Sequence, residues 1–181
     1  MEPKPYGSWR SPITSDLIAS EMIGLGQIAL DGDDIYWVEM RPAEGGRCVV
    51  VRRSPDGQTD VTPPPFNART RVHEYGGGAF VVADGGIYFS NFSDQRLYRQ
   101  DPSEPRPITP EKRLRYADSV IDRQSMICVR EDHTRHEVVN TLVSLDLKGD
   151  DCGKVIVSGN DFYSSPRLSR VASWRSMEPP P

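Results

Sequence analysis

The sequence predicts an all-β protein, more specifically part of a β-propeller, and three observations favour this class. The chain has 16 prolines and 15 glycines in 181 residues, which leaves room for many turns and few long helices. Short apolar segments alternate with turn sequences, as in strands joined by tight connections. Sets of four such segments then recur along the chain.

Two sequence signatures mark this recurrence. Ile35-Tyr36-Trp37 returns 52 positions later as Ile87-Tyr88-Phe89. Val61-Thr62-Pro63 returns 47 positions later as Ile108-Thr109-Pro110. Four short strands repeated at such a period are typical of propeller blades, whereas a single β-sandwich is the alternative for short, evenly spaced strands. The recurrence of whole four-strand sets favours the propeller.

Residues 1–25 are predicted to form an extended arm and one short helix. Three prolines in the first 14 residues disfavour a helix there, and Trp9 is available as an apolar anchor. Ser15 is a suitable cap for a helix over Asp16–Met22, the only helix that we expect.

The partial propeller is predicted over residues 26–169. The first set (26–63) has expected strands at Gln27–Leu30, Ile35–Met40, Cys48–Arg53 and Asp60–Thr62. The second (79–110) has them at Ala79–Val82, Ile87–Asn91, Arg96–Arg99 and Arg106–Thr109. The third (116–159) has them at Ala117–Ile121, Ser125–Arg130, Thr141–Leu147 and Lys154–Ser158, and a fourth set begins at 162–169.

About three blades and the start of a fourth do not close a ring, because propellers have ~4–8 blades and each blade is covered by two neighbours. We therefore expect an apolar face and open strand edges at the last blade. Such surfaces favour self-association.

Composition sets limits on partners and location. A net charge of −4 gives no electrostatic case for binding nucleic acid or an anionic membrane. No apolar run approaches the ~20 residues that span a bilayer, and the first residues do not resemble a secretion signal. Cys48, Cys128 and Cys152 have no paired spacing, which is typical of reduced thiols. We expect a cytoplasmic protein.

The segment from residue 67 to 80 is the most unusual in the chain. It contains Arg69, Arg71, His73, Glu74 and Tyr75, followed by three glycines and an apolar strand start. In an extended chain Arg71, His73 and Tyr75 would share one face. These five residues are the candidate substrate-binding site. The structural alternative is an ion pair between blades, with the tyrosine packed on the glycines.

This segment, Arg-Thr-Arg-Val-His-Glu-Tyr-Gly-Gly-Gly-Ala, resembles the propeller of serine peptidases of the prolyl-oligopeptidase family, in their dipeptidyl/acylaminoacyl-peptidase branch. The resemblance extends from about Trp9 to Ser169 and includes Tyr36-Trp37, the segment 60–67, the segment 88–98 and Leu114-Arg115-Tyr116-Ala117-Asp118. It implies an N-terminal propeller that screens peptide substrates and caps an α/β-hydrolase domain with the catalytic serine, aspartate and histidine. This chain is expected to stop before that domain.

No catalytic residue is assigned, because no Gly-x-Ser-x-Gly nucleophile turn occurs in the chain. No cofactor and no metal are expected. His133 and His136 are read as part of a solvated hairpin loop, and Asp31, Asp33 and Asp34 as a turn that lacks the glycine and glutamate of a calcium loop.

Residues 170–181 depart from the family pattern, and we expect them to be disordered. Codons ATG-GAA-CCA-CCC for residues 177–180, read one base later, would encode Trp-Asn-His. Our hypothesis is a frameshifted, truncated copy of a longer peptidase, which the coding DNA would test. We interpret the chain as a non-catalytic propeller fragment of such a peptidase. The alternative is a stand-alone propeller-like binding module that self-associates.

Overall fold

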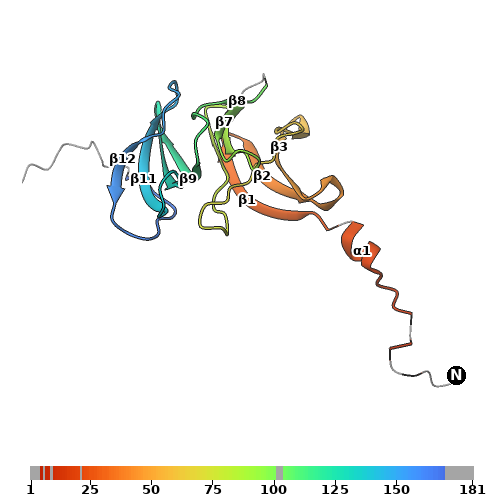
Figure 1. Cartoon of the computed structure of the whole chain (residues 1–181). Helices are drawn as coiled ribbons and strands as arrows, with labels where there is room; N and C mark the ends of the chain where they lie inside the picture. The colour runs from red at the N-terminus through yellow and green to blue at the C-terminus, as the bar shows by residue number, and fades with distance from the viewer. Residues whose placement is uncertain (1–4, 6, 9, 21, 101–103, 170–181) are drawn as a thin grey trace, which may run out of the picture.

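The computed structural model describes residues 5, 7–8, 10–20, 22–100 and 104–169. It shows three four-stranded antiparallel sheets that stand side by side in chain order (Figure 1). In each sheet the strands pair in sequence order, so each is a simple meander, the arrangement of a propeller blade. The predicted all-β class and partial propeller are confirmed. Trp9 and the predicted disordered tail at 170–181 lie outside the described residues.

The strands are close to those predicted. The first blade has β1 (Gly24–Asp31), β2 (Asp34–Arg41), β3 (Arg47–Ser54) and β4 (Gly57–Asp60), with a 3-10 turn η1 (Pro42–Glu44) between β2 and β3. The second has β5 (Phe80–Ala83), β6 (Gly86–Ser90), β7 (Leu97–Gln100) and β8 (Arg106–Pro107). The third has β9 (Leu114–Asp122), β10 (Ser125–Asp132), β11 (Val139–Asp146) and β12 (Lys154–Ser158).

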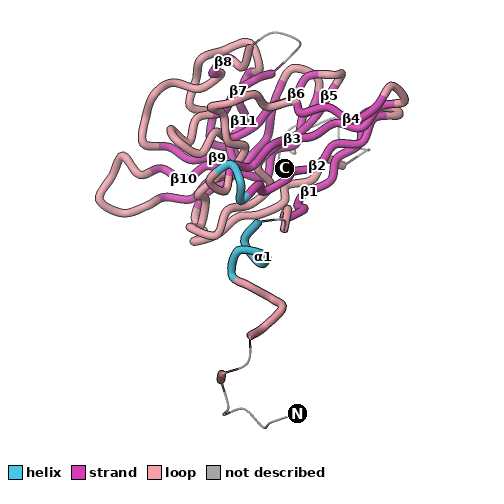
Figure 2. Tube along the Cα trace, turned by 90° about the vertical axis from the view of Figure 1, so that its right-hand side faces the viewer, coloured by secondary structure: helices cyan, strands magenta, loops and turns pink. Residues whose placement is uncertain are grey.

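Two local predictions were wrong in position. The helix α1 spans Ser15–Ser20, and its cap is Thr14, whose Oγ1 accepts a hydrogen bond from the Leu17 N–H at 3.1 Å. It lies apart from the sheets in both views (Figure 1, Figure 2). The outer strand of the first blade ends at Asp60, before the predicted Val61 and Thr62. Residues 159–169, where a fourth set was predicted to begin, carry no strand.

The repeat signature has a structural basis at two buried threonines. Thr62 Oγ1 accepts a hydrogen bond from the Val50 N–H at 2.9 Å, and Thr109 Oγ1 accepts one from the Leu97 N–H at 3.0 Å. Both threonine side chains are fully buried. Each threonine therefore supplies the acceptor for a backbone N–H of the third strand, at a position that the paired residues of the fourth strand do not reach.

Apolar layers between adjacent blades form the core. The first and second blades meet through a cluster that includes Tyr36, Val50, Phe80, Ile87 and Phe89. The second and third blades meet through Tyr88, Leu97, Ile108, Leu114, Tyr116, Met126, Cys128, Val143, Leu145 and Leu147. Burial of each large side chain contributes roughly 1.5–3 kcal/mol, so these layers hold the blades together.

The innermost strands β1, β5 and β9 contact one another in order, and a polar side chain at the bulge of β1 and another at the bulge of β9 form hydrogen bonds with the backbone around the start of β5. Gln27, at the bulge of β1, donates from Nε2 to the Phe80 carbonyl at 2.5 Å and accepts the Ala79 N–H at 2.8 Å. Asp118, in the bulged part of β9, accepts the Gly78 N–H at 2.5 Å and the Ser165 N–H at 2.9 Å.

The meander order decides which loops share an edge of the molecule. Successive turns of an antiparallel meander lie at opposite ends of the strands. The blade-to-blade connections 61–79 and 108–113 therefore lie at the same edge as the β6–β7 loop (91–96) and the β10–β11 loop (133–138). The candidate residues 69–75 belong to this edge.

Candidate functional site

Residues 71–76 form a tight turn just before β5, so the prediction of an extended segment with one polar face was wrong. The Glu74 N–H donates to the Arg71 carbonyl at 2.9 Å, and the Gly76 N–H donates to the Val72 carbonyl at 2.9 Å. His73 and Glu74 have left-handed backbone conformations, with φ of 55° and 60°. Such conformations are unusual for residues other than glycine, and here the surrounding contacts hold them in place.

The two arginines of the segment lie against one aromatic ring. The guanidinium carbon of Arg71 is 4.4 Å from the centroid of the Phe92 ring, and that of Arg69 is 4.9 Å from it. Both arginines are exposed, and neither is paired with a carboxylate among the residues that the structure describes. Cation–π contact fixes their position and leaves the hydrogen-bonding groups available.

His73 points inward and joins the connection to the third blade. Its backbone N–H donates to Glu131 Oε1 at 2.6 Å, and its Nε2 lies 2.9 Å from the Tyr163 carbonyl. Its ring makes an edge contact with Phe162, with centroids 5.0 Å apart. The other carboxylate oxygen of Glu131 lies 3.0 Å from His133 Nε2, and the Glu131 side chain is only 5% exposed. His133 opens the predicted exposed hairpin loop between β10 and β11, and there its ring is held by the buried carboxylate of Glu131.

Glu74 forms an ion pair between blades. Arg115 Nη1, on β9, donates to Glu74 Oε1 at 2.5 Å and to the Arg71 carbonyl at 2.8 Å. It also lies 3.5 Å from Glu131 Oε2. The hydrogen bond from Arg115, and then its charge, hold the pKa of the Glu74 carboxyl below its usual value.

Tyr75 is 96% exposed at the tip of the turn. The expectation that its ring packs on the glycines was wrong. Gly77 and Gly78 instead lie against β9, where an added Cβ at either position would come within 3.0 Å of Asp118 Oδ1. The glycines allow the two chains to approach closely, and the tyrosine faces solvent.

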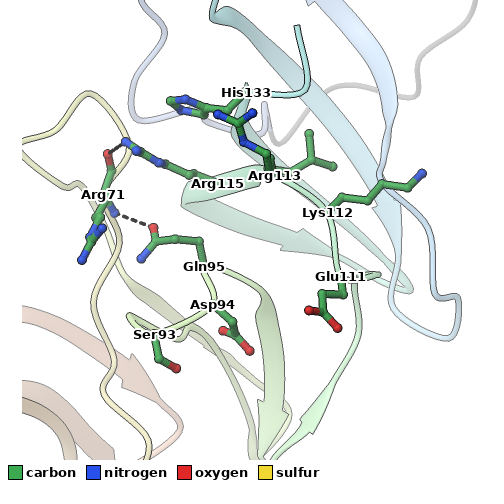
Figure 3. Close-up of a pocket in the computed structure, with 10 residues that line it drawn as sticks. Arg71, Ser93, Asp94, Gln95, Glu111, Lys112, Arg113, Arg115 and His133 are labelled. Carbon is green, nitrogen blue, oxygen red and sulfur yellow. Dashed lines mark hydrogen bonds between the residues drawn. The ribbon is translucent and has the colours of Figure 1, made fainter.

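A cleft of about 540 Å³ lies beside this turn, between the second and third blades (Figure 3). It is lined by Arg71, Ser93, Asp94, Gln95, Glu111, Lys112, Arg113, Leu114, Arg115 and His133. Gln95 Oε1 accepts the Arg71 N–H at 2.7 Å and so fixes one wall of the cleft to the β6–β7 loop. In Figure 3 Arg113, Arg115 and His133 lie together on another wall. Arg115 and Glu131 did not emerge from the sequence. Their only signal is the pairing of β9 with β10, which places them opposite each other.

The arrangement offers charged and aromatic groups for binding. Within the described ranges neither His73 nor His133 forms a hydrogen bond with a serine or cysteine, so neither imidazole is placed to activate a nucleophile there. In the described part of the chain no group of three or more histidine, cysteine or acidic side chains is placed to hold a metal ion. The three cysteines are unpaired, and burial raises the pKa of the Cys128 thiol to about 12.

Three meander blades stacked through apolar layers, with a charged edge between two of them, define this chain as a segment of a β-propeller. Comparison with solved structures refines the class. A puromycin-hydrolyzing peptidase from Mycobacterium tuberculosis matches with a TM-score of 0.82 and 36% sequence identity, over 91% of this chain and 29% of the peptidase. The chain belongs to the prolyl-oligopeptidase family and corresponds to its N-terminal propeller region.

Two further structures agree. A puromycin hydrolase matches with a TM-score of 0.73 and 36% identity, over 82% of this chain and 26% of the hydrolase. A mutant of puromycin hydrolase complexed with PGG matches with a TM-score of 0.72 and 36% identity, over 81% and 25%. The chain thus spans between a quarter and a third of the length of these proteins. No family model and no curated protein matches it. No helix among the described residues is long and apolar enough to cross a membrane.

Proposed function

We propose that this chain is the substrate-screening propeller portion of a peptide-hydrolysing enzyme of the dipeptidyl/acylaminoacyl-peptidase branch, and that it has no catalytic activity by itself. The match to puromycin-hydrolyzing peptidases at 36% identity over 91% of the chain carries the proposal. The segment from Arg69 to Ala79 supports the branch, and the unpaired cysteines support a cytoplasmic location.

Peptide binding is assigned to the edge formed by residues 69–75. Arg69 and Arg71 offer exposed guanidinium groups held on Phe92, which suits a peptide carboxylate. The side chain of Glu74 is 71% exposed although it contacts Arg115, so it remains accessible to a peptide ammonium group. Tyr75 adds an exposed ring that can pack on a peptide side chain.

The lack of catalysis follows from the chemistry of acyl transfer. That reaction needs an activated serine, a base that accepts its proton, and donors for the oxyanion. The 181 residues contain no Gly-x-Ser-x-Gly turn. The imidazole rings of His73 and His133 lie 3.2 and 3.0 Å from the Glu131 carboxylate, so neither is free to act as the base. We expect no turnover of aminoacyl-nitroanilides and no labelling by fluorophosphonate probes. Stoichiometric labelling of one serine, abolished by mutating that serine, would show the opposite.

Calorimetric titration with short unblocked peptides tests the binding role. Arg71→Gln and Glu74→Gln should each weaken binding several-fold and leave the melting temperature within about 1 °C, because both side chains are exposed. Arg106→Gln, on the exposed outer strand β8, is the matched control and should bind like the unmodified chain. A lower melting temperature with unchanged peptide binding would assign Glu74 a purely structural role.

A further inference from the structure

The cleft between the second and third blades holds more positive than negative charge. The described residues that line it include four cations and two carboxylates: Arg71, Lys112, Arg113, Arg115, Asp94 and Glu111. The chain as a whole has a net charge of −4, so the positive excess is local to this cleft. All of these residues belong to the second and third blades or to the connections that lead into them, so the cleft is formed within this chain.

Arg113 is the cation of this cleft whose charge is least compensated. Its side chain is exposed and forms no ion pair or hydrogen bond with the residues that the structure describes. Arg115, by contrast, is paired with Glu74 and lies 3.5 Å from Glu131 Oε2. Figure 3 nevertheless shows Arg113 beside Arg115 and His133. Like charges that are held close together repel each other, and a bound anion offsets that repulsion.

The opposite side of the cleft limits the charge of such an anion. Asp94 and Glu111 lie there in Figure 3. Asp94 accepts hydrogen bonds from the Tyr98 hydroxyl at 2.7 Å and from Asn91 Nδ2 at 3.1 Å, whereas Glu111 is exposed and has no such partner in the described part of the chain. Both carboxylates would repel a phosphate dianion about twice as strongly as a single carboxylate. The planar oxygens of a carboxylate also match the fork of a guanidinium group.

The cleft is continuous with the edge to which peptide binding is assigned, because Arg71 belongs to both. Its volume of about 540 Å³ is sufficient for a side chain of several atoms. We propose that the cleft binds the acidic side chain of a peptide, with the carboxylate on Arg113, so that the propeller prefers peptides that contain glutamate or aspartate. This inference rests on the proposed function, which assigns the peptide termini to residues 69–75.

Calorimetric titration of the full 181-residue chain with four peptides tests this proposal. Ala-Glu-Ala and Ala-Gln-Ala are each used with free termini and with an acetylated N-terminus and amidated C-terminus. In both forms the glutamate peptide should bind about five-fold more tightly than the glutamine peptide, or better. Arg113→Gln should remove this difference and leave binding of the glutamine peptide unchanged. The matched control Lys112→Gln removes the same charge from a side chain that extends away from Arg113 in Figure 3, and it should keep most of the difference.

The four peptides separate this inference from the proposed function. Equal binding of the glutamate and glutamine peptides would overturn the inference, while tighter binding of free than of blocked termini would still support the role of residues 69–75. A preference for glutamate with equal binding of free and blocked termini would support the inference and contradict that role. Binding of none of the four peptides would overturn both.

Two further outcomes would overturn the assignment of a carboxylate to Arg113. An equal loss of the preference in Arg113→Gln and Lys112→Gln would show a general effect of charge in place of a contact with Arg113. Tighter binding of a peptide with phosphoserine in the place of glutamate would show that the cleft selects a phosphate.

Discussion

His73 and Glu131 lie 58 residues apart in the sequence and are joined by a hydrogen bond of 2.6 Å from the His73 backbone N–H to the Glu131 carboxylate. The bond fixes the turn before β5 onto β10 of the next blade. The same carboxylate contacts His133 and Arg115, so one buried charge organises the edge between the second and third blades.

Replacing this carboxylate should therefore destabilise the fold. Glu131→Gln keeps the size of the side chain and removes the charge that faces Arg115 and two histidines. We expect a loss of about 1–3 kcal/mol in the free energy of unfolding, measured by urea denaturation. Glu137→Gln, in the exposed loop after β10, is the matched control and should stay within about 0.5 kcal/mol. Equal effects of the two changes would contradict the role assigned to Glu131.

The two buried threonines of the repeat should be equivalent. Thr62→Val and Thr109→Val preserve shape and leave the N–H groups of Val50 and Leu97 without an acceptor. Each should cost about 1–3 kcal/mol in urea denaturation. Thr59→Val, on the exposed face of β4, should have little effect. A large difference between Thr62 and Thr109 would mean that the two blades do not use the residue in the same way.

Gly78 should tolerate no side chain. A Cβ there would lie 3.0 Å from Asp118 Oδ1 and 3.4 Å from the Asp118 Cα, and Asp118 is held by its own hydrogen bonds. We expect Gly78→Ala to destabilise the protein by about 1–3 kcal/mol, as overpacking does. Thermal unfolding followed by circular dichroism would measure it. Gly149→Ala is the control, because its Cβ would meet nothing nearer than 3.4 Å. A neutral Gly78→Ala would show that β9 moves freely relative to the turn.

Stability should also depend on Asp60 in a defined pH range. Hydrogen bonds from Arg41, at 2.7 Å to Asp60 Oδ1, lower the pKa of this carboxyl. A lowered pKa means that the folded state holds the proton less tightly than the unfolded chain. The contribution is therefore present above about pH 4 and is lost as pH falls through the folded-state pKa.

Asp60→Asn should accordingly weaken the fold at pH 7 by less than about 1 kcal/mol, since the carboxylate is half exposed. The difference from the unmodified chain should shrink towards pH 2.5. Urea denaturation at pH 7, 5 and 2.5 measures it. A difference that is the same at all three values would exclude the ion pair as its cause.

The sequence was sufficient for the class of fold and for most strands. Turn residues and the recurrence of Ile-Tyr-Trp and Val-Thr-Pro are local signals. The recurrence located the first two blades, and the alternation of apolar segments with turns located the third. The end of β4 was misplaced because Thr62 looks like a strand residue. Its hydroxyl instead bonds to the Val50 N–H, which ends the pairing of the outer strand.

The site was harder to predict, because a single β-bulge determines which residues of β9 and β10 lie opposite each other. From the turn after Asp122, regular pairing would place Glu131 opposite Tyr116. The shift between Ile127 and Val129 places it opposite Arg115. Positive φ at His73 and Glu74 likewise depends on contacts with the third blade that no local pattern encodes. The candidate residues were identified, whereas their partners Arg115, Glu131 and Phe92 were not.

The connection 61–79 touches all three blades. Its Ala68 N–H donates to the Cys48 carbonyl in the first blade at 2.9 Å, its Arg69 N–H to the Ser90 carbonyl in the second at 2.9 Å, and its His73 N–H to Glu131 in the third at 2.6 Å. In an array where each repeat meets only its neighbours, terminal repeats fray independently. Here the first and third blades share one segment of backbone, so a disturbance in either one is transmitted to the other without passing through the sheet between them.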